Sequence, residues 1–528
     1  MHMSETLKVL DQRWRSTCKS ILGQEVGGLQ EFEGWLNERL EPGSVHNSIL
    51  SSKDITSSPT DYCKGAKWIS YDEIDFAKKF SPLNINEIKD IDSILSAIQE
   101  RIYYTGNLFF GNCGNIEKSS NLNDSFYIYN VRRNGNSKYL AYDTIGRLSE
   151  DCFGCNVIGE CQASIKSNVH KNKRCLEVWM CHGSEQCYYS FGLENCVDCI
   201  FCFNLKSRRQ NIGNLPLEKS KYLQIKQKLV SEMAQKLKKE KRLPSLIELM
   251  QFEKHNPAKI SVSAKSPNEP MDKNEIEKAF LQTTKMVFTK PLEGGIDSYA
   301  KWLQKHTHTV GKCVSAASGK ELVLPPHANH QYLPKNRLLS LREALEFGEK
   351  NSISEGQAQN LSLENAHEII SPLAFFSVEV LRGINKNNIN STYLFDSTNS
   401  YASSVVVYSK YIGYSFWPRS CEYLFGVDSP FDSRFSLNIY SCTNITRSFE
   451  IDCCGFCSDS YFCHNCENLA EAMFCFNVKN MRYAIGNAQL PPPDYKKIKE
   501  MLLEQMHDEL SKKKELKYDI YNIGCIGK

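Results

Sequence analysis

The strongest constraint on the fold is a run of small or apolar residues at every third position between residues 436 and 475, with Asn, Asp, Arg and Tyr filling most positions between them. An α-helix repeats every 3.6 residues and a flat strand every 2, so neither accommodates this period. A narrow coil whose short sides each point one small residue inward has this period. The spacing therefore predicts a parallel β-solenoid, or β-helix, with these inward residues: Ser436, Ile439, Cys442, Ile445, Ser448, Ile451, Cys454, Cys457, Ser460, Cys463, Cys466, Leu469, Ala472 and Cys475.

The first half of the chain carries a similar run between Cys175 and Cys202. Nine of the 22 Cys residues lie between Cys152 and Cys202, and eight lie between Cys421 and Cys475. Asn residues recur where a coil would turn its corners, and Asn tolerates the left-handed backbone of tight turns. These corner residues are Asn168, Asn195, Asn444 and Asn468.

The two halves align with each other over long stretches. Residues 17–36 match residues 284–303 without a gap, including a Gly-Gly pair and a Trp in each, and residues 174–237 match residues 447–510. Such self-similarity indicates an internal tandem duplication. Within it, Cys202–Asn214 (CFNLKSRRQNIGN) matches Cys475–Asn487 (CFNVKNMRYAIGN). We expect structural roles for the residues that both copies keep here: Cys202, Cys475, Gly213, Gly486, Asn214 and Asn487.

We therefore predict an α+β protein of two tandem copies. Each copy has an N-terminal α/β portion, a Cys-rich parallel β-solenoid and a C-terminal capping helix. The first copy covers residues 1–258, with its solenoid at about 105–214 and its cap helix at about 216–242. A linker covers residues 259–274. The second copy covers residues 275–528, with its solenoid at about 373–487 and its cap helix at about 492–515.

Shorter motifs predict local structure. Ser70-x-x-Glu73 and Ser340-x-x-Glu343 each follow an apolar pair, a spacing typical of a capping box in which Ser and Glu satisfy backbone N–H groups at a helix start. His306 and His308 could form a small metal or base cluster. We favour a polar turn there, because the first copy has no His in the equivalent places.

Paired C-x-x-C spacings raise the question of zinc. Thiolates two residues apart can bind one Zn²⁺. The equivalents of Cys454, Cys457, Cys463 and Cys466 in the first copy are Cys181, Ser184, Ser190 and Leu193, and a shared metal site would have kept its ligands. We therefore favour reduced Cys residues that pack as small hydrophobes, and keep zinc, or a disulfide, as alternatives. The candidate zinc ligands are Cys454, Cys457, Cys463, Cys466, Cys152, Cys155, Cys196, Cys199 and Cys202.

Other functional classes receive less support. A net charge of +3 over 528 residues does not indicate a polyanion-binding protein, although basic runs end both cap helices. A carbohydrate-active β-helix enzyme would need converging carboxylates, for which Asp198, Glu185, Asp452 and Asp459 are candidates. The charged N-terminus and the lack of a long apolar run predict a soluble intracellular protein without membrane contact.

The order C-x-x-C-x-x-C-F-N-L-K, I-G-N and Y-x-x-I-K, which begins at Cys196, resembles a family of uncharacterised Cys-rich repeat proteins of candidate-phyla bacteria, phages and large DNA viruses. The resemblance carries no catalytic residues, and its viral members imply a virion-associated structural role as one hypothesis. We expect a non-catalytic scaffold that binds a protein partner or assembles with itself. A zinc-dependent nucleic-acid-binding protein and a carbohydrate-active enzyme are the alternatives.

Overall fold

The computed structural model describes residues 3–255, 260, 262, 271–326 and 329–525. It divides into two compact units, each a mixture of helices and strands. Unit 1 consists of Met1–Gly43, Phe109–Pro267 and Lys312–Glu379. Unit 2 consists of Ser44–Leu108, Asn268–Gly311 and Val380–Lys528. The boundaries of the two predicted copies stay a prediction, and most of the linker 259–274 lies outside the described residues.

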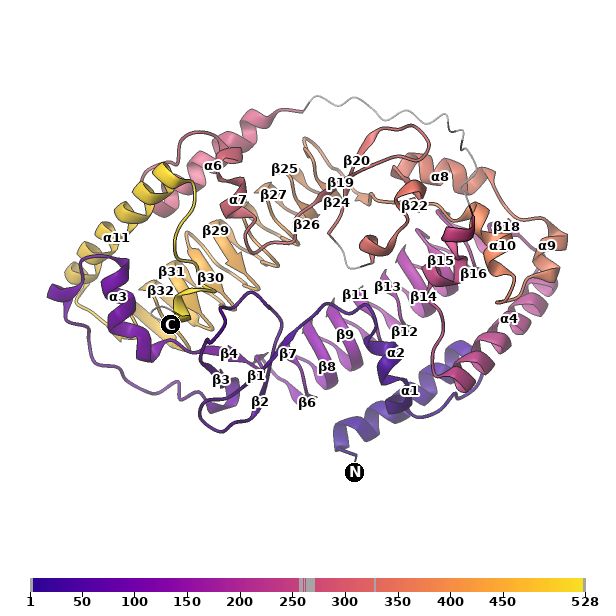
Figure 1. The fold of residues 1–528 in the computed structure, drawn as a ribbon, viewed down its shortest axis with the longest axis horizontal. Helices are drawn as coiled ribbons and strands as arrows, with labels where there is room; N and C mark the ends of the chain where they lie inside the picture. The colour runs from indigo at the N-terminus through magenta and orange to yellow at the C-terminus, as the bar shows by residue number, and fades with distance from the viewer. Residues whose placement is uncertain (1–2, 256–259, 261, 263–270, 327–328, 526–528) are drawn as a thin grey trace. The chain divides into compact units, whose positions relative to one another are not determined.

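A parallel, solenoid-like coil is the centre of unit 1, and we call it coil 1 (magenta strands in Figure 1). Only its last strand pairs antiparallel. Its strands are β5 (Phe109–Phe110), β6 (Gly114–Glu117), β7 (Ser120–Asn123), β8 (Phe126–Gly135), β9 (Lys138–Arg147), β10 (Glu150–Phe153), β11 (Asn156–Gly159), β12 (Gln162–Ile165), β13 (Asn168–His170), β14 (Lys173–His182), β15 (Glu185–Phe191), β16 (Val197–Ile200), β17 (Arg209–Ile212) and β18 (Leu215–Pro216).

Unit 2 contains coil 2, which is built in the same way (Figure 1). Its strands are also parallel up to an antiparallel last pair. They are β23 (Leu381–Arg382), β24 (Thr392–Phe395), β25 (Thr398–Tyr401), β26 (Ser404–Val407), β27 (Lys410–Gly413), β28 (Glu422–Phe425), β29 (Arg434–Tyr440), β30 (Phe449–Asp452), β31 (Ser458–His464), β32 (Glu467–Met473), β33 (Lys479–Ile485) and β34 (Ala488–Gln489).

Each rung of a coil takes twelve residues. Lys410 pairs with Glu422, and Glu422 pairs with Arg434, each twelve residues further along the chain. In both coils nearly every third residue has positive φ, so a rung has four sides of three residues. A left-handed residue other than Gly costs roughly 1–2 kcal/mol, which the hydrogen bonds between rungs and the buried core must offset. The period of three in the sequence is therefore the length of one side.

The residues predicted to point inward are buried in both coils, including Cys175 to Cys202 and Ile439 to Cys475 at every third position. The predicted corner residues Asn195, Asn444 and Asn468 have positive φ. Asn168 does not, because the strand register shifts between Asn168 and Val169. At this shift one rung is a residue shorter, since Gln162 pairs with Lys173.

Helices cover part of each coil. In unit 1 these are α1 (Glu5–Leu22), α2 (Glu33–Asn37), α4 (Lys219–Glu240) and α5 (Leu246–Met250). In unit 2 they are α6 (Lys273–Phe288), α7 (Ala300–Leu303) and α11 (Pro492–Lys513). Helices α4 and α11 agree with the predicted cap helices, and their apolar stripes, including Tyr222 and Tyr495, are buried. Within the described parts of the chain, no helix combines the length and apolar character needed to cross a membrane.

Each unit also holds a segment from the other half of the chain. Residues 44–108 of unit 2 form β1 (Ser44–Asn47), β2 (Asp54–Ser57), β3 (Trp68–Ser70), α3 (Ile91–Ile98) and β4 (Tyr104–Gly106). Residues 312–379 of unit 1 form most of β19 (Gly311–Val314), then β20 (Glu321–Leu324), β21 (Leu338–Leu339), α8 (Leu341–Lys350), α9 (Glu355–Asn360), α10 (Ala366–Ile370) and β22 (Phe376–Ser377). We call these two stretches the exchanged segments. The predicted capping boxes at Ser70 and Ser340 are confirmed.

Candidate functional site

The candidate zinc ligands all point into the coils. Because one rung has four sides of three residues, Cys454 and Cys457 lie on successive sides of one rung, and Cys466 lies one rung after Cys454. The thiols bond to the backbone: Cys454 Sγ donates to the Asp452 carbonyl at 3.2 Å and accepts from the Cys466 N–H at 3.2 Å. Among the described residues, no group of three or more His, Cys, Asp and Glu side chains could hold a metal ion. The zinc assignment therefore has no support in this geometry.

The remaining candidates have the same surroundings in coil 1. Cys152 and Cys155 lie on successive sides of one rung, as do Cys196, Cys199 and Cys202, and all five are fully buried. Burial raises the pKa of the Cys152 and Cys202 thiols, whereas hydrogen bonds from the neighbouring Cys187, Cys196 and Cys202 lower the pKa of Cys199. Zinc would need several thiolates together.

Backbone bonding also explains why Cys and Ser interchange between the halves. Ser448 Oγ accepts the Ser460 N–H at 3.1 Å, one rung later, as Cys454 Sγ accepts the Cys466 N–H. Either side chain also donates to the carbonyl two residues before it, as Ser448 does to Thr446 at 3.0 Å. The inward positions that hold Cys or Ser thus favour a small hydrogen-bonding side chain.

The residues that both halves of the sequence keep lie at the C-terminal end of each coil. In unit 1, Asn214 Oδ1 accepts the Phe203 N–H at 2.8 Å and Asn214 Nδ2 donates to the Phe203 carbonyl at 3.2 Å. In unit 2, Asn487 makes the same two bonds with Phe476, at 2.8 and 2.9 Å. The Asn amide satisfies backbone groups that a further rung would otherwise bond. Both coils therefore end in the same way.

We call these coil ends the seats. The seat of unit 1 is Cys202–Asn204 with Ile212–Asn214, and the seat of unit 2 is Cys475–Asn477 with Ile485–Asn487. In unit 2, Asn477 Nδ2 donates to the Tyr103 carbonyl at 2.8 Å and Arg101 Nη1 donates to the Gly486 carbonyl at 2.6 Å. The seat of unit 2 thus holds the exchanged segment 44–108.

The seat of unit 1 holds the exchanged segment 312–379 through corresponding atoms. Asn204 Nδ2 donates to the Phe375 carbonyl at 2.8 Å, and the Ile353 N–H donates to the Gly213 carbonyl at 3.0 Å. Asn214 Nδ2 also donates to the Gly348 carbonyl at 3.0 Å. The structural residues predicted from the sequence therefore lie where a distant part of the chain docks.

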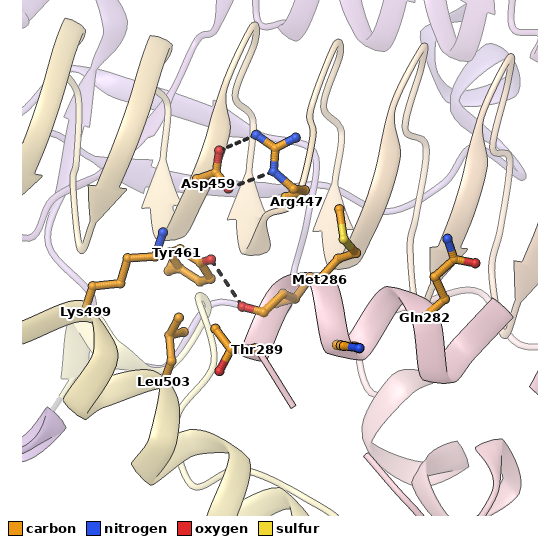
Figure 2. Close-up of a pocket in the computed structure, with 10 residues that line it drawn as sticks. Gln282, Met286, Thr289, Arg447, Asp459, Tyr461, Lys499 and Leu503 are labelled. Atoms are coloured by element: carbon orange, nitrogen blue, oxygen red, sulfur yellow. Dashed lines mark hydrogen bonds and ion pairs between the residues drawn. The ribbon is translucent and has the colours of Figure 1, made fainter. Parts of the chain in front are cut away.

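A pocket of about 540 Å³ lies in unit 2, lined by residues of α6, α11 and coil 2 (Figure 2). Three of its charged groups are engaged in ion pairs. Arg447 binds Asp459 through two hydrogen bonds of 2.9 and 2.6 Å, and Lys499 binds Glu471 at 2.6 Å. Tyr461 donates to the Val287 carbonyl at the end of α6. These contacts fasten α6 and α11 to the coil.

Unit 1 repeats this fastening. Lys226 of α4 binds Asp198 at 2.6 Å, and Tyr188 donates to the Ile21 carbonyl at the end of α1 at 2.8 Å. Lys226 and Tyr188 are the counterparts of Lys499 and Tyr461 in the sequence alignment of the halves. In both units a Lys–acid ion pair holds one helix on the coil and a Tyr–carbonyl hydrogen bond holds the other. These polar residues are therefore explained by helix packing and need no ligand.

A buried cluster in unit 2 contains acid–base residues that the sequence analysis did not bring together. His464 Nδ1 donates to Asp452 Oδ2 at 2.7 Å, and His464 Nε2 accepts the Thr105 N–H at 2.9 Å. Tyr62 also donates to Asp452, at 2.6 Å. His464 and Asp452 are fully buried and both imidazole nitrogens are engaged, so the pair has neither solvent access nor a free nitrogen for proton transfer.

Next to this cluster lies a buried ionic group. His306 lies 3.0 Å from Asp61 and 3.3 Å from Asp519. Burial alone would lower the pKa of His306, but the two carboxylates outweigh it and raise the pKa to about 9. Burial, with the nearby Asp519 charge, raises the pKa of the Glu450 carboxyl to about 8. The predicted turn at His306 is confirmed, since residues 304–306 form a turn, but its imidazole is buried between two acids.

The four carboxylates considered for sugar chemistry are divided between the units. Asp198 binds Lys226 and Glu185 binds Arg174 in unit 1, while Asp452 binds His464 and Asp459 binds Arg447 in unit 2. A general acid and base must face one substrate. These pairings support structural roles instead.

Comparison with protein-family models, with curated proteins and with solved structures gave no match. One covalent feature was not predicted from the sequence. Cys63 of the exchanged segment and Cys525 near the C-terminus form a disulfide in unit 2. The other described Cys residues are thiols outside any disulfide.

Proposed function

We propose that the protein is a non-catalytic scaffold, built from two tandem copies of one solenoid unit, that binds through the outer faces of its coils. The duplication is supported by the matched seats and by the matched Lys–acid and Tyr–carbonyl contacts described above. We propose no catalytic residues, because the side chains of Asp198, Asp452, Asp459 and His464 are bound to other side chains of the protein.

The observation that carries the binding role is one exposed column of coil 2. Corner residues twelve apart stack along the coil and are all exposed: Tyr408, Ser420, Asp432, Asn444, Phe456, Asn468 and Asn480. Tyr408 and Phe456 are 55% and 58% exposed, which is high for large aromatic side chains. Aromatic residues on a rigid surface are favoured at protein interfaces, because little side-chain entropy is lost on binding.

The surface beside this column is charged with both signs. On one side lie Lys410, Glu422 and Arg434, with Lys410 bound to Glu422 at 3.2 Å. Two exposed aromatic residues four rungs apart in this column, beside charges of both signs, match the aromatic enrichment and the polar rim of protein–protein interfaces. It fits a nucleic acid less well, since a phosphate backbone favours a surface of one positive sign.

Self-assembly through this column can be tested with the purified protein alone. Sedimentation velocity over about 1–100 µM would show concentration-dependent association of the wild-type protein. The double variant Tyr408→Ser, Phe456→Ser should weaken it, since two interface aromatics contribute together about 3 kcal/mol, or roughly a hundredfold in Kd. Leu223→Ser, at an exposed apolar residue of α4, is the control and should change nothing. A wild-type protein that stays monomeric throughout would refute self-assembly through this column.

A further inference from the structure

The two halves of the chain exchange segments. Unit 2 takes Ser44–Leu108 from the first half, and unit 1 takes Lys312–Glu379 from the second. In each unit the exchanged segment supplies core residues, not only surface contacts. The buried core of unit 2 contains these residues of the exchanged segment: Ile55, Trp68, Ile88, Ile91, Ile94, Leu95, Ile98, Ile102 and Tyr104.

Hydrogen bonds from buried atoms hold the exchanged segment of unit 2 in place. Tyr104 donates to the Ile520 carbonyl at 2.7 Å, and Thr105 Oγ1 donates to Asn477 Oδ1 at 2.6 Å. The Cys63 N–H donates to the Tyr521 carbonyl at 3.0 Å. If the segment left, the donors and acceptors of coil 2 and of the C-terminal stretch would lose buried partners, which is costly.

In unit 1 the exchanged segment also packs closely against the end of coil 1. Phe376 of the exchanged segment packs against Phe191 and Phe203 of coil 1, with ring centroids 4.9 and 6.1 Å apart. A Cβ on Gly348 would lie 2.6 Å from the Phe203 carbonyl oxygen, so the segment approaches the seat backbone closely. Neither coil end is complete without residues from the other half.

We infer that the two halves are obligate partners, and that residues 1–262 and 263–528 form a stable two-chain complex when the bond between them is cut. The interaction surfaces are the two seats, and the occupant of each seat is the exchanged segment of the other half. A chain with one copy would, by the same contacts, pair with a second copy of itself.

The experiment cuts the full-length folded protein. A specific protease site is inserted after Val262, in a Cys63→Ser, Cys525→Ser background so that no disulfide links the fragments. After cleavage we expect one species with the mass of the whole chain, 60.3 kDa, by light scattering and native mass spectrometry. In urea it should separate into two fragments. Two folded fragments that migrate separately at micromolar concentration, or precipitation of either fragment, would overturn the inference.

Two further measurements keep the test decisive. If the Ser variant does not fold, the protease site is placed in a chain that keeps Cys63 and Cys525, and cleavage is done under dithiothreitol. Fragment exchange between unlabelled and isotope-labelled cleaved protein then compares Asn477→Ala with Asn480→Ala. Both Asn residues are left-handed corners of coil 2, but only Asn477 contacts the exchanged segment. We expect Asn477→Ala to exchange at least tenfold faster than Asn480→Ala, and equal rates would contradict docking at this seat.

Discussion

Replacing Gly486 by Ala tests the seat of unit 2 through one added methyl group. Gly486 has φ of +56°, and an added Cβ would lie 2.4 Å from Ile98 Cγ2 of the exchanged segment. The left-handed backbone costs an Ala about 1 kcal/mol. The collision adds about 1–3 kcal/mol, because Ile98 is fully buried and has little room to move. We expect a total loss of about 2–4 kcal/mol in the free energy of unfolding.

Gly319→Ala is the matched control. Gly319 has φ of +72°, and nothing lies within 4 Å of an added Cβ. It therefore carries the backbone cost of about 1 kcal/mol without the collision. Urea unfolding followed by tryptophan fluorescence would compare the variants, and hydrogen exchange of peptides spanning α3 would localise the effect. Equal losses for the two variants would refute the claim that the exchanged segment presses on the seat glycine.

Three other predictions concern charge, covalent linkage and the thiols. In the folded protein the carboxylates of Asp61 and Asp519 raise the pKa of His306 to about 9. His306→Gln should therefore remove a stabilisation of up to about 3 kcal/mol, which is fully present below pH about 6.5 and is lost as the pH rises through about 9. Urea midpoints that stay parallel to those of the wild type from pH 6 to 9.5 would contradict this. Cys63→Ser with Cys525→Ser should cost about 3–5 kcal/mol, because the disulfide closes a separation of 462 residues, and unchanged midpoints would refute it. Cys454→Ser should fold with its metal content unchanged by elemental analysis, because Ser can make the same backbone bonds; loss of a stoichiometric metal would revive the zinc alternative.

Local features of this fold were predictable because their causes are local. One residue in three points inward wherever a side has three residues, so the period of the sequence predicted the buried positions from Cys175 to Cys202 and from Ile439 to Cys475. The capping boxes at Ser70 and Ser340 need only four consecutive residues. The cap helices follow from an apolar stripe of helical spacing.

Long-range contacts were not predictable for an equally physical reason. His464 meets Thr105 across 359 residues, and no local pattern signals that pairing. The Cys63–Cys525 disulfide lies outside both Cys-rich runs, so the spacing argument that served the coil residues gave no sign of it. The turn at His306 was predicted but the burial of its side chain was not, because Asp61 and Asp519, the acids that enclose the imidazole, are distant in sequence.

The exchange of segments could not be predicted because the two seats are alike. Both carry Cys-Phe-Asn and Ile-Gly-Asn, so the sequence does not indicate whether a segment docks on its own copy or on the other. The atoms that bind the segments do not distinguish one segment from the other either. Asn204 and Asn477 both bond to a backbone carbonyl, that of Phe375 or Tyr103, just before a short strand. Any side chain can offer that carbonyl, which explains how the seats keep the same residues while the segments they hold differ in sequence.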